Sequence, residues 1–152
     1  MKKVIITGGN SGIGYQAAKQ LAEKGWSVTL FCRRKEAAEQ ACEKIRQQTG
    51  NSRVDYILVD LSEMKSVRKA VKQYIQKEQT LDVLINNAAD FDLSIKKPIL
   101  TKDGLEKQFA TNVVAPFLLS TLLKGLLEKS ESGRIINISS QGLVLYPFMK
   151  LD

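Results

Sequence analysis

The sequence has no uninterrupted apolar run of about eighteen residues, the length that suggests a membrane-spanning helix. At the amino terminus, Lys2 and Lys3 are followed by only three apolar residues, Val4–Ile6. That run is too short for the apolar region of a secretory signal. We therefore expect no membrane span and a cytoplasmic protein.

Cysteines are few. The chain has two, Cys32 and Cys42, and their spacing is not that of metal ligands. We expect reduced, structural thiols and no metal site. No repeat, low-complexity tract or linker divides the 152 residues, so we expect one domain over residues 1–152.

The net charge is +7, but no basic face is concentrated in the sequence. Most lysines are scattered along predicted helices, a pattern typical of a solvated surface. A nucleic-acid-binding module would need a concentrated basic patch or a known motif, so we expect no nucleic acid partner. The smaller cluster Arg33-Arg34-Lys35 is better explained by a phosphate group of a cofactor.

Short apolar runs alternate with segments of helical periodicity. The runs are Lys3–Thr7, Ser27–Cys32, Val54–Val59, Leu81–Ile85 and Arg134–Ile138. Strands that are apolar throughout and joined by helices are typical of a parallel sheet covered on both faces. With right-handed crossovers, this predicts an α/β fold: a three-layer, doubly wound Rossmann sheet of strand order 3-2-1-4-5.

The helices are expected over Gly12–Lys24, Lys35–Gln48, a segment starting at Ser62, and Thr101–Lys129. Ser62 is the predicted N-cap of its helix, and Pro116 should kink or interrupt the last one. The periodicity predicts a buried stripe of Ile13, Ala17, Ala18, Leu21 and Ala22 on the first helix. On the third, it predicts burial of Met64, Val67, Val71, Tyr74 and Ile75.

The fifth strand, Arg134–Ile138, presents a difficulty, because no later segment is available to cover it or pair with it. A long apolar edge strand is an association hazard. We therefore expect a domain truncated on its carboxyl-terminal side, and a chain that self-associates or dissolves poorly.

The loop Thr7–Gly14 carries the strongest functional signal. It follows the first strand, contains four glycines, and leads into a helix. Glycines permit a tight turn and a close approach to a diphosphate, and the helix N-terminus supplies oriented N–H groups. Glycines also occur in such turns for steric reasons alone, but the strand–loop–helix context favours a dinucleotide site.

The glycine spacing in this loop resembles that of the short-chain dehydrogenase/reductase family, whose signature is Thr-Gly-x-x-x-Gly-x-Gly. Further matches follow in the family's order, and the resemblance runs from Val4 to Ser140. They are Asp60-Leu61, Asn86-Asn87-Ala88-Ala89, Asn112 and Asn137-Ile138-Ser139-Ser140, with Ala89 in place of the family's glycine. The resemblance, with the two arginines considered next, implies cofactor contacts from Gly8, Asn10, Ser11, Gly12, Ile13, Gly14, Arg33, Arg34, Asp60, Leu61, Asn87, Ala88 and Ala89.

Cofactor selectivity depends on the end of the second strand. An NAD-selective site needs a carboxylate there for the ribose 2′-hydroxyl. The chain instead has Arg33 and Arg34, with no acid before Glu36. A guanidinium suits bidentate phosphate contact, although both arginines could simply face solvent. We predict NADP(H), with Arg33 the stronger candidate for the 2′-phosphate.

The resemblance also implies catalytic residues. In the family, a serine hydrogen-bonds the substrate oxygen, and a tyrosine assisted by a lysine four residues later transfers the proton. Ser140 is the stronger match to this serine and Ser139 the weaker one, although both could merely cap the strand end. Asn112 matches a structural and catalytic asparagine.

Tyr146 and Lys150 have the family's tyrosine–lysine spacing, but we do not assign them. Tyr146 lies only six residues after Ser140 and directly precedes Pro147. A following proline disfavours helical geometry at that tyrosine. We expect the pair beyond Asp152, and no appreciable turnover by this chain alone.

The segments around Thr101–Leu119 and Arg134–Asn137 are similar to the retinol dehydrogenase-like and protochlorophyllide reductase-like branch. That similarity implies an alcohol or carbonyl substrate with an apolar body, and a homo-oligomer when the domain is complete. The first hypothesis is an NADP(H)-dependent oxidoreductase. The second is a non-catalytic dinucleotide-binding or redox-sensing protein, because a fold does not fix a function.

Overall fold

The computed structural model describes residues 1–92, 94 and 97–140. Five parallel strands form one sheet in the order β3-β2-β1-β4-β5, which confirms the predicted doubly wound fold. The strands are β1 Lys3–Thr7, β2 Ser27–Cys32, β3 Val54–Leu58, β4 Val83–Asn86 and β5 Arg134–Asn137.

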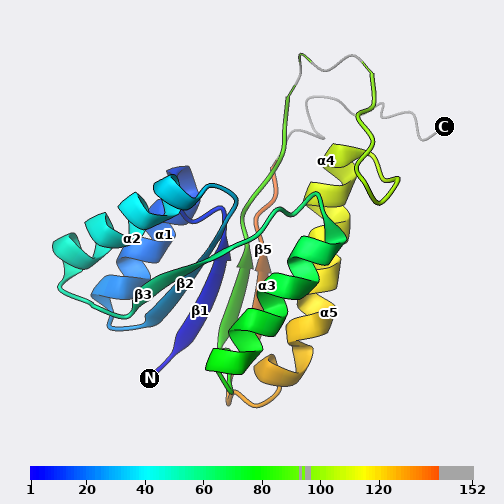
Figure 1. Cartoon of the computed structure of the whole chain (residues 1–152). Coiled ribbons are helices and arrows are strands. Elements are labelled where there is room, and N and C mark those ends of the chain that lie inside the picture. Colours follow the sequence, from blue (N-terminus) through cyan, green and yellow to red (C-terminus); the bar gives the residue numbers. More distant parts are fainter. Residues whose placement is uncertain (93, 95–96, 141–152) are drawn as a thin grey trace.

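Helices cover both faces of this sheet (Figure 1). On one face lie α1 and α2, and on the other α3 and α5. The helical segments are α1 Gly12–Glu23, α2 Lys35–Thr49, α3 Met64–Lys77, α4 Lys107–Phe109, a π-helical turn Ala110–Val114, and α5 Ala115–Leu127.

Strand β1 shows how the sheet joins two cores. Val4 and Ile6 belong to the apolar cluster beneath α1 and α2, whereas Ile5 belongs to the cluster with α3 and α5. All three are fully buried. Alternate residues of a strand point to opposite faces, so a central parallel strand has to be apolar throughout.

The start of α3 differs from the prediction. The helix begins at Met64 with Glu63 as its N-cap residue, not at Ser62. The Ser62 backbone N–H and hydroxyl both donate to Asp60 Oδ1, at 2.9 and 2.7 Å. Ser62 was wrongly predicted as the cap because this local turn, common for Asp and Ser, already engages its hydroxyl.

Two residues predicted to be buried are exposed. Ile13, in the first turn of α1, is 70% exposed, and Ile75 on α3 is 40% exposed. Ile13 precedes the part of α1 that packs on the sheet, where Ala18 and Ala22 are buried. On α3, the buried face includes Ala70 and not Ile75.

The last long helix begins later than predicted, at Lys107 instead of Thr101. Thr101 forms a compact turn instead: its Oγ1 accepts the Leu105 N–H, and its carbonyl oxygen accepts the Gly104 N–H. Gly104 has a φ of 73°, which suits glycine. Glu106 then caps the helix through the N–H groups of Gln108 and Phe109.

Pro116 lies in the first turn of α5, directly after the π-helical turn Ala110–Val114. Proline has no N–H to donate, so the regular hydrogen-bond ladder is broken near it. Single π-helical turns accommodate such breaks and often occur at functional sites. The predicted interruption at Pro116 is therefore present as a change of helical pitch.

The chain between β4 and α4 is tied to the start of α3. Asp103 Oδ2 accepts the Met64 N–H at 2.8 Å, and Lys102 Nζ donates to Glu63 Oε1 at 2.7 Å. Asp103 thereby satisfies an N–H group that the first turn of α3 leaves without a helical partner.

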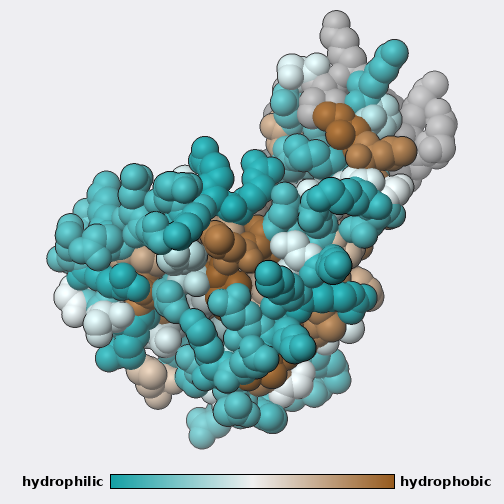
Figure 2. Space-filling view, in the orientation of Figure 1, coloured by the Kyte–Doolittle hydropathy of each residue, from teal (hydrophilic) through white to brown (hydrophobic). Residues whose placement is uncertain are grey.

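Strand β5 lies at an edge of the sheet and is exposed along its whole length. Ile135, Ile136 and Ile138 are each 42–45% exposed, as the sequence predicted for this strand. Figure 2 shows a largely hydrophilic surface with hydrophobic colour in a central strip and in a patch beside the grey residues. Whether the chain associates through β5 stays a prediction.

One helical stretch among the described residues, Lys107–Leu127, is long and apolar enough to cross a membrane. About a third of its most apolar window is buried within the fold. Its Leu119, Leu123 and Leu126 belong to the core cluster shared with α3, so packing accounts for part of its apolar character.

Candidate functional site: a cavity at the carboxyl ends of the strands

The loop after β1 is shaped by its glycines. Gly8 and Gly12 have φ values of 65° and 54°, a region that other residues rarely adopt. A Cβ on Gly9 would lie 2.6 Å from Leu30 Cδ2. The loop therefore needs glycine for both its turns and its packing on β2.

The N-terminus of α1 is free to meet an anion. Ser11 precedes the helix, and its side chain makes no capping bond to the first turn. That turn contains no acidic residue. The first N–H groups of a helix lack helical acceptors and carry partial positive charge, so they are suited to bind a phosphate.

The loop is joined to the segment after β4 through Thr7. Thr7 Oγ1 accepts the N–H groups of Asn87 and Ala88, at 2.9 and 3.0 Å. A Cβ on Gly14 would collide with the Asn87 side-chain amide and the Gly8 carbonyl oxygen. These contacts fix the distance between the glycine loop and the segment after β4, which form two walls of the candidate site.

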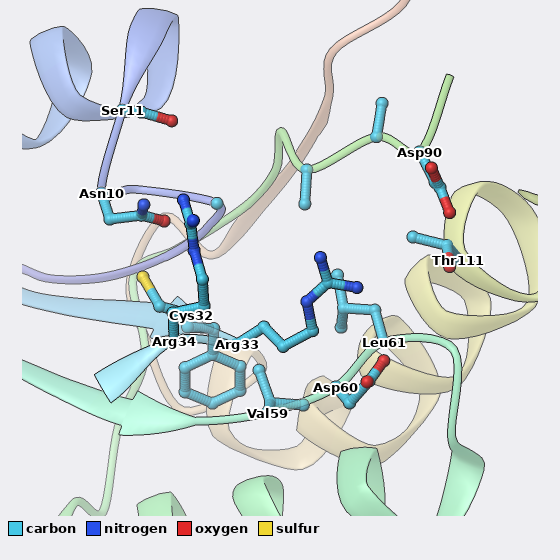
Figure 3. A pocket seen from close by; sticks show the side chains of 14 residues that line it. Asn10, Ser11, Cys32, Arg33, Arg34, Val59, Asp60, Leu61, Asp90 and Thr111 are labelled. Atoms are coloured by element: carbon cyan, nitrogen blue, oxygen red, sulfur yellow. The ribbon is translucent and has the colours of Figure 1, made fainter. Parts of the chain in front are cut away.

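A cavity of about 350 Å³ opens between these segments at the carboxyl ends of the strands (Figure 3). In doubly wound sheets, ligands bind at this end, where the strand order reverses. The cavity is lined by Gly8, Asn10, Ser11, Phe31, Cys32, Arg33, Arg34, Val59, Asp60, Leu61, Ala88, Ala89, Asp90 and Thr111.

Most of the predicted cofactor residues are brought together here. Gly8, Asn10, Ser11, Arg33, Arg34, Asp60, Leu61, Ala88 and Ala89 line the cavity. The others, Gly12, Ile13, Gly14 and Asn87, are not among its lining residues, although Gly14 and Asn87 support its walls. These assignments remain predictions about binding.

The two arginines at the end of β2 point in different directions. In Figure 3 the Arg34 side chain lies beside Asn10, whereas the Arg33 side chain extends toward Leu61 and Asp60. Among the described residues, neither arginine takes part in an ion pair. Both guanidinium groups are therefore available to an anion in the cavity.

Five lining residues were not predicted: Phe31, Cys32, Val59, Asp90 and Thr111. Phe31, Cys32 and Val59 end strands that the sequence did identify, so their position at the carboxyl edge was the available signal. Asp90 and Thr111 carried no comparable signal, because they belong to a loop and to the π-helical turn.

Cys32 is a buried thiol at the cavity wall. Burial raises its pKa to about 11, despite the opposing effect of the Asn10 and Gly9 backbone groups. Burial also raises the pKa of Cys42 to about 12. Both thiols are thus neutral near pH 7, which agrees with a structural role.

The predicted catalytic residues lie outside the cavity lining. Asn112 forms two hydrogen bonds with the Asp90 backbone: its Oδ1 accepts the N–H at 2.7 Å, and its Nδ2 donates to the carbonyl oxygen at 2.8 Å. Ser139 and Ser140 follow β5 and are exposed. Tyr146 and Lys150 lie outside the described residues.

Asn86 and Asn137 join the last two strands at the same edge. Asn86 Nδ2 donates to Asn137 Oδ1 at 2.8 Å. Asn86 is 5% exposed, and its Oδ1 has no hydrogen-bond partner among the described residues. No group of three or more His, Cys, Asp or Glu in that part of the chain could hold a metal ion.

Comparisons with known proteins agree on one family. The family model described as short chain dehydrogenase matches residues 2–150. The dehydrogenase/reductase SDR family member 12 of Bos taurus is 45% identical over 141 residues, covering 93% of this chain and 43% of that protein. Retinol dehydrogenase 13 of Mus musculus is 44% identical over 140 residues, covering 91% of this chain and 41% of that protein. The chain thus spans less than half the length of these relatives.

Solved structures show the same likeness. The Pseudomonas aeruginosa RhlG/NADP active-site complex superposes with a TM-score of 0.77 and 29% identity, covering 91% of this chain and 54% of that one. A metagenomic short-chain oxidoreductase in complex with NADP gives a TM-score of 0.79 and 26% identity, covering 91% and 61%. The predicted likeness to retinol dehydrogenases is confirmed, and the chain belongs to the short chain dehydrogenase family.

Proposed function

We propose that the chain binds NADP(H) in the cavity at the carboxyl ends of β1, β2, β3 and β4. The observation that carries this proposal is a pair of arginines, Arg33 and Arg34, that have no ion-pair partner among the described residues. They lie beside a glycine loop and a helix N-terminus without a side-chain cap. The arginines suit a 2′-phosphate, and the glycine loop with the helix N-terminus suits a diphosphate. Two similar solved structures are complexes with NADP.

The lining residues divide into regions that suit the parts of such a cofactor. The diphosphate would lie on the loop Gly8–Gly14, and the adenine beside Asp60 and Leu61. The 2′-phosphate would lie between Arg33 and Arg34, whose side chains flank the cavity near β2. Ala88 and Ala89 would form the wall on the nicotinamide side. Among the described residues, Asp60 Oδ1 accepts two hydrogen bonds from Ser62, and Asp60 forms no ion pair with Arg33.

We propose further that the whole domain transfers hydride between nicotinamide and an alcohol or carbonyl substrate with an apolar body. The bound nicotinamide would supply or accept the hydride. Ser140 would hydrogen-bond the substrate oxygen, and Asn112 would hold the cavity wall through the Asp90 backbone. We assign the proton transfer to neither Tyr146 nor Lys150, and expect this chain to bind cofactor without appreciable turnover.

A titration of the 152-residue chain with NADPH and NADH, followed by calorimetry or nicotinamide fluorescence, tests the binding proposal. We expect saturable, one-to-one binding of NADPH and markedly weaker binding of NADH. Equal affinities would contradict the role of the arginines. No binding of either nucleotide would overturn the proposed function.

An activity assay separates this proposal from a non-catalytic nucleotide-binding protein. With the complete protein, consumption of NADPH in the presence of aldehydes or ketones supports the oxidoreductase. Binding without consumption across a panel of such substrates would favour the non-catalytic alternative. We propose a cytoplasmic location and a homo-oligomeric complete protein, to be checked by fractionation and light scattering.

A further inference from the structure

The positive and negative groups that line the cavity differ in whether they have partners of their own. Its lining contains two cations, Arg33 and Arg34, and two carboxylates, Asp60 and Asp90. Among the described residues, each carboxylate has donors of its own, whereas neither arginine is in an ion pair. Asp60 is held by Ser62 and Asp90 by Lys107.

The contact between Asp90 and Lys107 is sheltered. Lys107 Nζ lies 2.9 Å from Asp90 Oδ2, and the two side chains are 30% and 23% exposed. By comparison, the Lys124 and Glu128 side chains of a pair on α5 are 70% and 61% exposed. Salt screens sheltered pairs less than exposed ones, so the first pair should matter more.

The same short helical segment holds Asp90 and its neighbour from several directions. Lys107 meets the Asp90 carboxylate, and Asn112 meets the Asp90 backbone through both of its amide atoms. Between them, Gln108 Nε2 donates to the Asp92 carbonyl oxygen at 3.4 Å. The start of the last long helix thus fixes the wall on the side of the cavity opposite Asn10 and Arg34 in Figure 3.

We propose that Lys107 is a positioning residue that neutralises the Asp90 carboxylate, so that the cavity accepts an anionic dinucleotide. This inference rests on the proposed binding of NADP(H). Without the ammonium group, a carboxylate would face the cavity uncompensated and repel the phosphates. With it, the two arginines dominate the electrostatic potential inside the cavity.

The test compares NADPH dissociation constants of Lys107→Gln, Lys107→Arg and the wild type. At about 0.01 M salt, where the screening length is roughly 30 Å, we expect Lys107→Gln to raise the dissociation constant about three- to tenfold. The ratio should be smaller at about 1 M salt, where the screening length is roughly 3 Å, although partly buried charges are screened less than exposed ones. Lys107→Arg should bind as the wild type does. Lys124→Gln is the matched control, because it removes the same charge and an ion pair outside the cavity.

Asp90→Asn provides the second arm. Asp90→Asn alone should lower the NADPH dissociation constant at low salt, and Asp90→Asn/Lys107→Gln should bind about as the wild type does, because the net charge at this wall is then the same as in the wild type. A loss of affinity in Lys107→Gln that is the same at low and high salt, or an Asp90→Asn/Lys107→Gln variant that binds as weakly as Lys107→Gln alone, would overturn the inference in favour of a purely structural lysine. If Lys107→Gln does not fold, the two-arm comparison is made with Lys107→Met in the same backgrounds, under the same criteria.

Failure of this inference is distinguishable from failure of the proposed function. If the wild type binds NADPH and Lys107→Gln binds it equally well at low salt, only the role of Lys107 is wrong. If the wild type binds no NADPH, the proposed function is wrong and the inference is overturned with it.

Discussion

Thr7 and Asn87 are joined by two hydrogen bonds across the gap between β1 and β4. The Asn87 backbone N–H donates to Thr7 Oγ1 at 2.9 Å, and the Asn87 side-chain amide donates to the Thr7 carbonyl oxygen at 3.0 Å. One contact fixes the backbone after β4, and the other fixes the start of the glycine loop. The two nucleotide-facing walls are therefore a single hydrogen-bonded unit.

Thr7→Val should loosen this unit. The substitution keeps the shape of the side chain but leaves the Asn87 and Ala88 N–H groups without their acceptor. We expect a loss of about 1–3 kcal/mol in the free energy of unfolding, measured by urea denaturation, together with weaker NADPH binding. Thr7→Ser retains the hydroxyl and should keep most of the stability and most of the affinity for NADPH. Equal stability of the Val and Ser variants would mean that these bonds contribute nothing.

Gly14→Ala should be harmful although Gly14 lies in a helix, where alanine is normally favoured. Its Cβ would meet the Asn87 amide and the Gly8 carbonyl oxygen, and relieving such a clash costs about 1–3 kcal/mol. The matched control is Gly125→Ala on α5, where a Cβ would meet no atom within 4 Å. That variant should gain about 0.5–1 kcal/mol. Thermal unfolding of the two variants should therefore shift in opposite directions, and a shared direction would refute the steric account.

Arg33→Asp should change the nucleotide preference. A carboxylate at this position can accept a ribose hydroxyl and repels a 2′-phosphate. We expect NADPH binding to weaken by about ten- to a hundredfold, with NADH binding unchanged or tighter. Arg68→Asp, at an exposed position on α3 outside the cavity lining, serves as the charge-matched control. Unchanged affinities for both nucleotides in Arg33→Asp would show that Arg33 does not contact the phosphate.

The two buried thiols make stability depend on alkaline pH. Burial raises the pKa of Cys32 from 9.0 to about 11 and that of Cys42 from 9.0 to about 12. A pKa raised on folding gives stability that is complete below the unfolded value and is lost as the pH rises through the folded one. We expect the free energy of unfolding to fall between pH 9 and 11 in wild type. The fall should be shallower in the double variant Cys32→Ala/Cys42→Ala. If the free energy of unfolding falls equally steeply with pH in both proteins, the raised pKa values of the two thiols are contradicted.

The strands and their order were predictable because a parallel sheet demands a distinctive sequence. Val4, Ile5 and Ile6 are apolar in succession since both faces of β1 are buried. Helix starts were predicted less well, because Ser and Thr hydroxyls serve turns as readily as caps. The Ser62 hydroxyl donates to Asp60, and the N-cap residue of the helix there is Glu63 instead. The Thr101 hydroxyl accepts a hydrogen bond within its own turn, and the last helix begins only at Lys107.

The candidate site was predictable where motifs adjoin strand ends, as with Gly8, Arg33 and Asp60. The part of the cavity wall that contains Asp90 was not predictable. Its carboxylate reaches Lys107, and its backbone reaches Asn112, across a loop whose path no spacing rule describes. Contacts of this kind depend on where a loop returns to the fold, and that is decided by tertiary packing.

The bond from the Met64 N–H to Asp103 Oδ2 joins residues 39 positions apart. During synthesis, α3 therefore leaves the ribosome well before the residue that completes its first turn. Until β4 has joined β1 and the chain has turned back, that end of α3 can fray. The Asp60-Leu61 edge next to it would then be among the last parts of the cavity to become protected from hydrogen exchange. We expect pulse-labelling of a folding chain to show the cavity becoming protected first at its glycine loop and later at Asp60-Leu61.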